Sequence, residues 1–150
     1  YALLTNPDQL SALRADPAAI TNAVEEILRY YGPAETSTLR WALQDFEMDG
    51  QQIERGAPLL FLLASANHDP ERFADPETFN ISRTDANRHV AFGKGAHICL
   101  GLHLARFQME EGLHLIAQRL KNPQVAGEGT WRRFPGVWGI EALPIRFTPA

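Results

Sequence analysis

The sequence predicts an α+β fold that is mainly helical and carries small β-sheets. Three observations lead to this prediction. Apolar residues recur at helical spacing in two segments, residues 21–31 and 100–120. Asp49-Gly50 is a strong hairpin signal, and further short apolar patches lie near the C-terminus. With 150 residues, of which 45 % are hydrophobic, the chain is long enough for one compact unit with its own core.

Charge and composition exclude several classes of protein. The net charge is −4 at pH 7, so no basic field attracts nucleic acid. The longest apolar stretch, Pro58–Ala66, is far shorter than the ~18 residues of a membrane span, so no membrane segment is evident. Cys99 is the only cysteine, which rules out an intrachain disulfide and favours a reducing compartment. Because the chain begins at Tyr1 without an initiator Met, we expect it to lack its natural beginning.

Two helices are expected near the N-terminus. Asn6-Pro7 predicts the start of a short helix over Asp8–Ala15, which ends before Pro17. Thr21 is of a residue type that caps helix N-termini, and the second helix ends at Gly32-Pro33. The apolar residues of this second helix recur at helical spacing: Val24, Ile27, Leu28 and Tyr31.

Strands are expected in the next segment. Thr36–Phe46 alternates as a strand does, and Asp49-Gly50 follows it as a hairpin turn. Pro58–Ala66 is a continuous apolar run of strand length, which predicts a buried strand.

The second half combines an irregular segment, a long helix and a short hairpin. Asn67–Val90 is rich in Asp, Pro, Asn and Arg, and so long an irregular segment usually has a functional reason. The helix that follows is expected to end at Asn122-Pro123. Its apolar stripe consists of Leu100, Leu104, Phe107, Leu113, Ile116 and Leu120. The apolar patches Phe134–Ile140 and Leu143–Phe147 are predicted to pair as short strands.

The chemistry of the chain is concentrated in residues 92–101. Gly93, Gly95 and Gly101 allow positive φ and a close approach of the backbone to a flat or bulky group. Cys99 lies at the entrance of the long helix, where free N–H groups and the helix dipole favour a thiolate. Because the thiolate is the form of cysteine that binds metal, this arrangement offers one anionic sulfur to an iron centre.

Two other interpretations of Cys99 stay open on these residues alone. A lone cysteine is most often a small buried hydrophobic residue. His97, Cys99 and His103 are close enough in sequence to suggest zinc, although a structural zinc site usually needs four ligands and no second cysteine pair is present.

Residues 92–106 resemble the haem-binding loop and the following helix of the cytochromes P-450. The family pattern is F-G-x-G-x-[HR]-x-C-x-G-x-x-L-A-R, and the chain matches it at every fixed position. The pair Glu26 and Arg29 resembles the family's E-x-x-R motif, whose two side chains share one helical face. The resemblance runs from about residue 6 to residue 147. It implies the C-terminal part of the P-450 fold, with residues 1–150 as a haem-binding portion and the N-terminal portion absent.

In this family the E-x-x-R pair is buried and is completed by an arginine from the irregular segment. Pro70-Glu71-Arg72-Phe73 matches the family's well-known tetrapeptide literally. However, the register of Asp75–Arg83 resembles the bacterial members, in which the arginine ends the run. We therefore expect Glu26, Arg29 and Arg83 to form the cluster, and Arg72 to lie on the surface.

The resemblance also implies roles around haem b, that is, iron protoporphyrin IX. Cys99 matches the thiolate ligand of the iron, and Phe92 the residue that shields its sulfur from water. His97 and Arg40 match residues that bind the haem propionates. Small residues are expected where the porphyrin passes close to the chain: Gly93, Gly95, Gly101 and Ala105.

Two segments resemble the places where family members touch their substrates. The first contains Ala34, Glu35, Thr36 and Ser37, and the second contains Phe134 and Pro135. A small-molecule substrate is thus implied, together with a ferredoxin-type electron donor and its NAD(P)H reductase. Lys94, Arg72 and Arg106 are candidates for a basic patch that faces the acidic donor.

The implied activity is that of a haem-thiolate monooxygenase, which hydroxylates or epoxidises a small organic substrate with O₂ and two electrons. The family's oxygen-activating helix would precede Tyr1, so we expect this chain to be inactive alone. The alternative is a non-catalytic accessory protein of the same fold. Such relatives typically lack the haem cysteine, which Cys99 supplies here.

Overall fold

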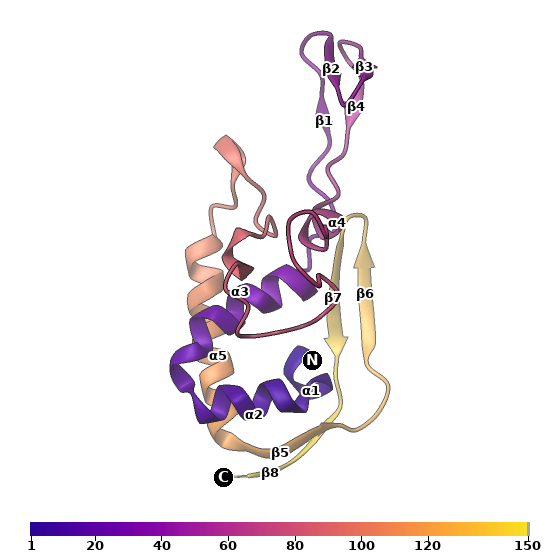
Figure 1. The fold of residues 1–150 in the computed structure, drawn as a ribbon. Helices are drawn as coiled ribbons and strands as arrows, with labels where there is room; N and C mark the ends of the chain where they lie inside the picture. The colour runs from indigo at the N-terminus through magenta and orange to yellow at the C-terminus, as the bar shows by residue number, and fades with distance from the viewer. Residues whose placement is uncertain (150) are drawn as a thin grey trace.

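Figure 1 shows the fold in a computed structural model, which describes residues 1–149 except for the side chain of Arg133. The α-helices are α1 (Ala2–Thr5), α2 (Pro7–Ala15), α3 (Ile20–Tyr31), α4 (Leu63–Asn67) and α5 (Leu102–Arg119). Single turns of 3₁₀-helix are η1 (Pro17–Ala19), η2 (Ala86–Arg88) and η3 (Gly95–His97). The strands are β1 (Arg40–Trp41), β2 (Phe46–Met48), β3 (Gln51–Ile53), β4 (Pro58–Leu59), β5 (Leu120–Val125), β6 (Thr130–Phe134), β7 (Val137–Ala142) and β8 (Ile145–Pro149).

The strands form small two-stranded antiparallel sheets, and the helices form the body of the molecule. β1 pairs with β4, β2 with β3, β5 with β8, and β6 with β7. This arrangement confirms the predicted mainly helical α+β class. In the described residues no helix combines the length and the apolar character that crossing a membrane requires.

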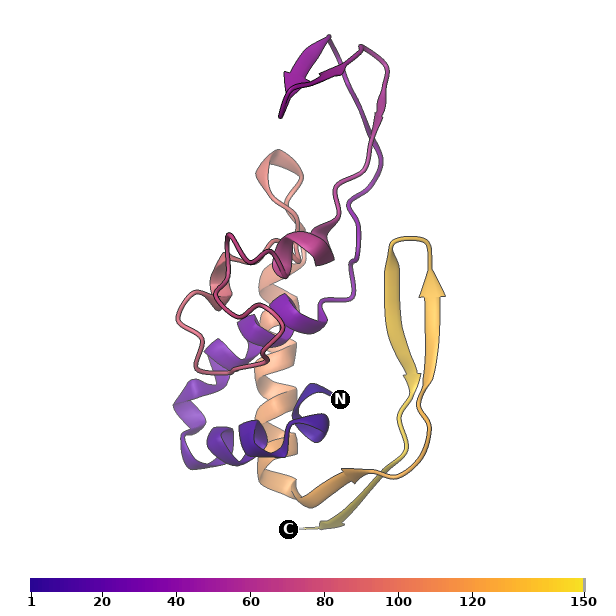
Figure 2. The same cartoon turned by 45° about the vertical axis from the view of Figure 1, so that its right-hand side comes forward.

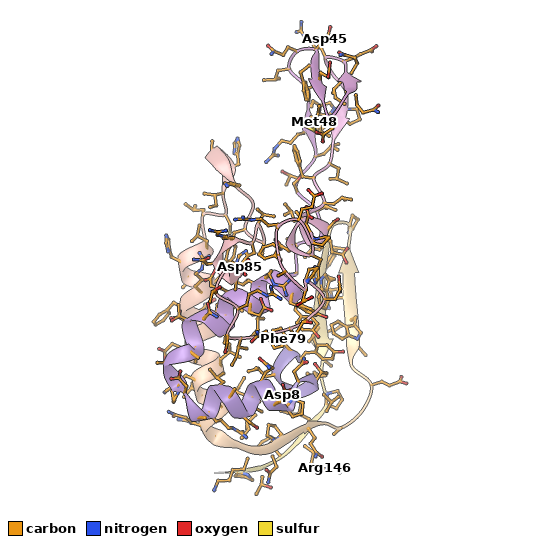
Figure 3. All side chains as sticks on the ribbon, viewed as in Figure 1. Asp8, Asp45, Met48, Phe79, Asp85 and Arg146 are labelled. Atoms are coloured by element: carbon orange, nitrogen blue, oxygen red, sulfur yellow. The ribbon has the colours of Figure 1, made fainter. Side chains whose placement is uncertain are left out.

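The core lies where α2 and α3 cross α5 (Figures 1 and 2). Leu10 and Leu13 of α2 pack there with Ala23 of α3. The irregular segment adds Phe79 and Ile81, and Figure 3 shows Phe79 near the centre of the body. This packing holds the long loop against the helices, so an irregular chain acquires a defined shape without regular hydrogen bonding.

Residues 40–59 extend away from the helices as a narrow arm (Figures 1 and 2). β1 and β4 form its base, and β2 and β3 form its tip, near which Figure 3 labels Asp45 and Met48. Asp49 and Gly50 have φ of +48° and +76°, which is the conformation of a two-residue hairpin turn. The predicted hairpin at Asp49-Gly50 is therefore confirmed.

The buried strand predicted for Pro58–Ala66 is wrong. Only Pro58 and Leu59 pair, residues 60–62 are about half exposed, and α4 begins at Leu63. An apolar run this short fits a strand or a helix equally well, and Ala-Ser-Ala after Leu63 suits a helix. Thr36–Phe46 is likewise not one strand, because regular pairing in it is confined to β1, the start of β2 and one bridge from Thr36 to Leu62.

The ends of the two main helices differ from expectation. Thr21 does not cap α3, which begins at Ile20 directly after η1; Asp16 caps η1 by accepting a hydrogen bond from the Ala18 N–H at 3.1 Å. At the other end of the chain, α5 stops at Arg119 rather than at Asn122-Pro123. These two residues lie in β5 at a bulge opposite β8, where proline's missing N–H does not interrupt the ladder.

The apolar residues of α5 and of the tail are also arranged differently from the prediction. α5 packs through Met109, Leu113 and Ala117, whereas Leu100 is fully exposed and Leu104 is 60 % exposed. The tail hairpin consists of β6 and β7, so the turn falls inside the patch predicted as one strand, Phe134–Ile140. The patch Leu143–Phe147 contributes to β8, which pairs with β5 instead.

Candidate functional site

Residues 92–101, called the cysteine loop from here on, form a tight exposed loop before α5. Gly93 and Gly95 have φ of +71° and +82°, which only glycine adopts without strain. The Cys99 N–H donates to the Phe92 carbonyl at 2.9 Å and closes the loop. The thiol of Cys99 is exposed, and it lies 3.9 Å from where a Cβ on Gly101 would stand. The sulfur is therefore presented outward and is not a packed core residue.

An apolar cavity of about 490 Å³ lies beside this sulfur, between α3 and the start of α5. Leu28, Leu63 and Met109 contribute apolar wall to it. Five of the residues predicted to bind the cofactor line the cavity: Phe92, Gly93, His97, Cys99 and Ala105. The other three, which do not line it, are Arg40, Gly95 and Gly101.

The donor set and the wall of this cavity fit haem. One sulfur that can become an anion is available as a metal ligand, and the wall around it is mainly apolar. Gly93 and Ala105 are small, which leaves room for a flat macrocycle close to the chain. The volume is in the range of cavities that hold ligands of this size.

The two residues predicted to bind propionates have different surroundings. His97 is exposed and lines the cavity. Arg40 lies in β1 at the base of the arm, and its guanidinium donates to the Thr38 hydroxyl. The structure thus places only His97 directly at the cavity wall.

Glu26 and Arg29 form a buried ion pair one turn apart on α3. The Arg29 Nε donates to Glu26 Oε2 at 2.7 Å and its Nη2 to Oε1 at 2.9 Å. Both side chains are almost fully buried, with exposed fractions of 0 % for Glu26 and 1 % for Arg29. Arg29 also donates to the carbonyl oxygens of Asn67, Pro76 and Thr78. The pair therefore ties the irregular segment to α3.

Arg83 joins this pair from the irregular segment. Its Nε lies 3.4 Å from Glu26 Oε1, and its other nitrogens donate to the carbonyl oxygens of Ala74, Asp75 and Thr78. Arg72, in contrast, is exposed. The structure brings together the three residues expected to form the cluster.

We expect Arg83→Ala to destabilise the protein by about 2–3 kcal/mol, because charge-assisted hydrogen bonds to several carbonyls are lost. Arg72→Ala is expected to change the free energy of unfolding by under about 0.5 kcal/mol, as surface substitutions do. Urea unfolding of the two variants measures the difference. Equal effects would show that the assignment of Arg83 to the cluster is mistaken.

The two predicted substrate-contact segments lie side by side. Ala34 forms a bridge with Val137, and the N–H groups of Glu35 and Thr36 point to the Gly136 carbonyl at 2.9 and 3.3 Å. Gly136 has φ of +75°, and a Cβ there would stand 2.2 Å from the Thr36 hydroxyl. Close backbone contact therefore joins the exit of α3 to the β6–β7 turn.

The remaining predicted members of these segments lie around the same contact. Ser37 exchanges hydrogen bonds with Phe61, and Phe134 and Pro135 are exposed at the turn. Ala34 also lines the cavity beside Cys99, so this joined surface borders the candidate cofactor site.

Sequence reasoning missed a second charged cluster, centred on Glu25. The Arg106 Nε lies 2.5 Å from Glu25 Oε1, its Nη2 donates to Oε2 at 2.9 Å, and His89 Nε2 lies 3.1 Å from Oε2. Arg106, a candidate for the basic patch that faces an electron donor, is partly exposed, and its guanidinium is bound by the Glu25 carboxylate. Arg106 is a fixed position of the cysteine-loop pattern, which is the signal that was available in the sequence.

Opposing effects set the pKa of Glu25. Burial raises its pKa, but hydrogen bonds from His89 and Arg106 outweigh burial and lower the pKa from 4.5 to about 2. Because the folded-state pKa is the lower one, the carboxylate's contribution to stability is fully present above about pH 4.5. That contribution is lost as the pH falls towards 2.

This shift predicts how Glu25→Gln changes the acid stability of the protein. Near neutral pH the variant is expected to be less stable than the wild type by on the order of 2 kcal/mol. The gap should shrink as the pH falls through the window between the two pKa values of Glu25. Urea unfolding at a series of pH values tests this expectation, and a gap that stays constant across the acid range would contradict it.

Zinc receives no support from the geometry. In the part of the chain that the structure describes, no three His, Cys, Asp or Glu side chains are grouped so that they could hold a metal ion together. His97, Cys99 and His103 are thus close in sequence without forming such a group.

Three features of this site are typical of a haem-thiolate protein. They are an exposed cysteine before a helix, an apolar cavity beside it and a buried Glu–Arg–Arg cluster. The family model of cytochrome P-450 matches residues 17–137, so the chain belongs to the cytochrome P-450 family. Members of this family use haem b, ligated through a cysteine thiolate, as their cofactor.

Similar proteins include bacterial members with known roles. Cytochrome P-450 monooxygenase PikC of Streptomyces venezuelae is 44 % identical over 152 residues, covering 98 % of this chain and 36 % of PikC. The 6-deoxyerythronolide B hydroxylase of Saccharopolyspora erythraea is 42 % identical over 149 residues, covering 97 % of this chain and 36 % of the hydroxylase.

A solved structure of the same family matches the fold closely. P450BioI, in complex with an acyl carrier protein ligated to hexadec-9Z-enoic acid, has a TM-score of 0.92 and 38 % sequence identity. The match covers 97 % of this chain and 38 % of P450BioI. The chain thus spans somewhat more than a third of the length of these relatives.

Proposed function

We propose that this chain is the C-terminal, haem-binding portion of a monooxygenase. The proposed enzyme inserts one oxygen atom of O₂ into a small organic substrate by hydroxylation or epoxidation, with two electrons from a redox partner. The observation that carries the proposal is the exposed sulfur of Cys99 beside an apolar cavity of about 490 Å³. The names of PikC and of the hydroxylase support the same class of activity.

The residues predicted to bind the cofactor would hold haem in different ways. Cys99 would ligate the iron as a thiolate, and Phe92 would keep water from that sulfur. His97 and Arg40 would receive the propionates, while Gly93, Gly95, Gly101 and Ala105 would let the macrocycle approach the chain. When bound in this way, thiolate-ligated haem supplies the cleavage of the O–O bond of O₂.

The substrate would be bound at the surface formed by residues 34–37 and 134–135. Backbone hydrogen bonds and a bridge join its two segments, and Ala34 of this surface lines the cavity. The relatives named for a hydroxylation or a monooxygenation support a small organic molecule as the substrate class.

The remaining parts of the proposed enzyme lie outside residues 1–150. We infer an N-terminal portion that supplies the oxygen-activating helix, since the relatives are far longer and since Leu104 and Phe107 of α5 are each 60 % exposed here. Such a portion would cover these apolar side chains. A ferredoxin-type donor with its NAD(P)H reductase would supply electrons. A cytoplasmic location would keep the single cysteine reduced.

A single spectrum tests the proposed function. The full-length protein that contains this chain is loaded with haem, reduced and exposed to carbon monoxide. We expect the strongly red-shifted Soret band that marks a thiolate ligand. Its absence would overturn the proposal and favour the alternative, an accessory protein of the same fold without catalysis.

A further inference from the structure

Glu25 and Glu26 are adjacent on α3 but hold different parts of the chain. Glu26 accepts hydrogen bonds from Arg29, from Arg83 and from the Asn80 N–H. These contacts hold the irregular segment against α3. Glu25 faces away from that cluster, because successive residues of a helix point in different directions. Its carboxylate instead accepts from a residue before the cysteine loop and from a residue after it.

The contact before the loop runs through His89. One ring nitrogen of His89 lies 3.1 Å from Glu25 Oε2, and the other lies 3.0 Å from the Ala91 N–H. Asn67 Oδ1 holds the intervening residue by accepting from the Val90 N–H at 2.7 Å. The backbone that enters the cysteine loop is therefore fixed to the buried face of α3.

The contact after the loop runs through Arg106 on α5. Both carboxylate oxygens of Glu25 bind its guanidinium, which fixes the plane of the group as well as its position. That plane lies over the ring of Phe92, with the guanidinium carbon 5.0 Å from the ring centre. The Phe92 carbonyl in turn accepts from the Cys99 N–H. A continuous series of contacts thus joins Glu25 to the backbone of Cys99.

The loop itself has few contacts of its own that would hold the sulfur in place. Residues 94–101 are exposed, and besides the hydrogen bond from the Cys99 N–H to the Phe92 carbonyl, the main-chain hydrogen bonds from Gly93, Ile98 and Leu102 close only local turns. The position of the sulfur therefore depends on how firmly the two ends of the loop are held.

We propose that Glu25, His89 and Arg106 form a positioning network that fixes both ends of the cysteine loop and so sets the place of the Cys99 sulfur. The inference rests on the proposed function, since it concerns the sulfur as an iron ligand. None of the three residues is itself a ligand; each acts through the loop.

Glu25→Gln in the full-length, haem-loaded protein tests the network. The substitution keeps the size of the side chain but removes the charge that binds Arg106 in two places. The red-shifted Soret band of the reduced carbon monoxide complex is expected to convert to the unshifted band about 10-fold faster than in the wild type. Transfer of haem to an excess of apomyoglobin is expected to accelerate by roughly the same factor.

Two controls separate positioning from charge and from general stability. Glu110→Gln also removes a carboxylate near Arg106, one turn further along α5, but Glu110 forms no ion pair within residues 1–149. Arg14→Ala removes the hydrogen bonds that Arg14 donates to the Ala117 and Leu120 carbonyls at the far end of α5. Both controls should leave the conversion rate close to that of the wild type, because neither removes a contact that holds the cysteine loop.

Each outcome settles the inference. It is overturned if Glu25→Gln converts as slowly as Glu110→Gln, or if Arg14→Ala accelerates conversion equally. If Glu25→Gln yields no haem protein, Arg106→Lys is used instead. This variant keeps the charge and loses the forked contact, so a wild-type conversion rate in it overturns the network. A wild-type protein without the red-shifted band overturns the proposed function itself, and this inference falls with it.

Discussion

Replacing Cys99 with alanine is expected to abolish the red-shifted Soret band of the reduced carbon monoxide complex completely. The reason is that only an anionic sulfur gives this spectrum, and Cys99 is the only cysteine of the chain. Cys99→His should also remove the band, even where haem stays bound, because a neutral imidazole donates less electron density to the iron. The measurement is the absorption spectrum of each full-length variant after loading with equal amounts of haem.

His103→Ala is the matched control for this experiment. His103 is exposed on the first turn of α5, four residues after Cys99, and belongs to the triplet that suggests zinc. The control variant is expected to keep the full band. A red-shifted band that survives in either Cys99 variant would falsify the assignment of the iron ligand.

Arg29→Ala is expected to destabilise the protein by about 3–5 kcal/mol, the cost of leaving a buried charge without its partner. Glu26 would then be buried without the guanidinium that binds both of its oxygens. The carbonyl oxygens of Asn67, Pro76 and Thr78 would lose a donor as well. Since total stability is typically about 5–15 kcal/mol, the variant should unfold at a clearly lower urea concentration than the wild type.

A double substitution distinguishes a lost charge from lost packing. Glu26→Leu combined with Arg29→Met removes both charges and retains much of the volume. If the penalty comes from an unpaired buried charge, the double variant should be more stable than Arg29→Ala, as judged by urea unfolding. If the double variant is no more stable than Arg29→Ala, the loss of stability comes instead from the missing hydrogen bonds to the irregular segment.

The helices α2, α3 and α5 could be predicted because their signals are local. α3 and α5 are long enough for apolar residues to recur over several turns, and the prolines at 7, 17 and 33 mark boundaries by removing a donor. The hairpin turn at Asp49-Gly50 could be predicted for the same reason, since its two adjacent positive φ angles favour Asp or Asn followed by Gly. In these elements the conformation depends on neighbours in the sequence.

The strands could not be predicted in the same way. Pro58–Ala66 is apolar throughout, yet pairing stops after two residues and the rest turns into α4 or becomes exposed. Likewise, Leu120 leaves α5 because β8 is available as a partner for β5. Whether a short segment forms a strand depends on which distant segment of the chain lies beside it. The local sequence pattern does not specify that partner.

By itself, the sequence determined the glycine and cysteine pattern of residues 92–101, because that pattern lies along a single segment. Its resemblance to the family pattern then pointed to Cys99 as the thiolate candidate and to Glu26 and Arg29 as a buried pair. Only the tertiary structure showed that residues 34–37 meet the β6–β7 turn, and that Glu25 binds both His89 and Arg106. The physical reason is that contacts across 64 and 81 positions of the chain form only when packing brings α3, the irregular segment and α5 together.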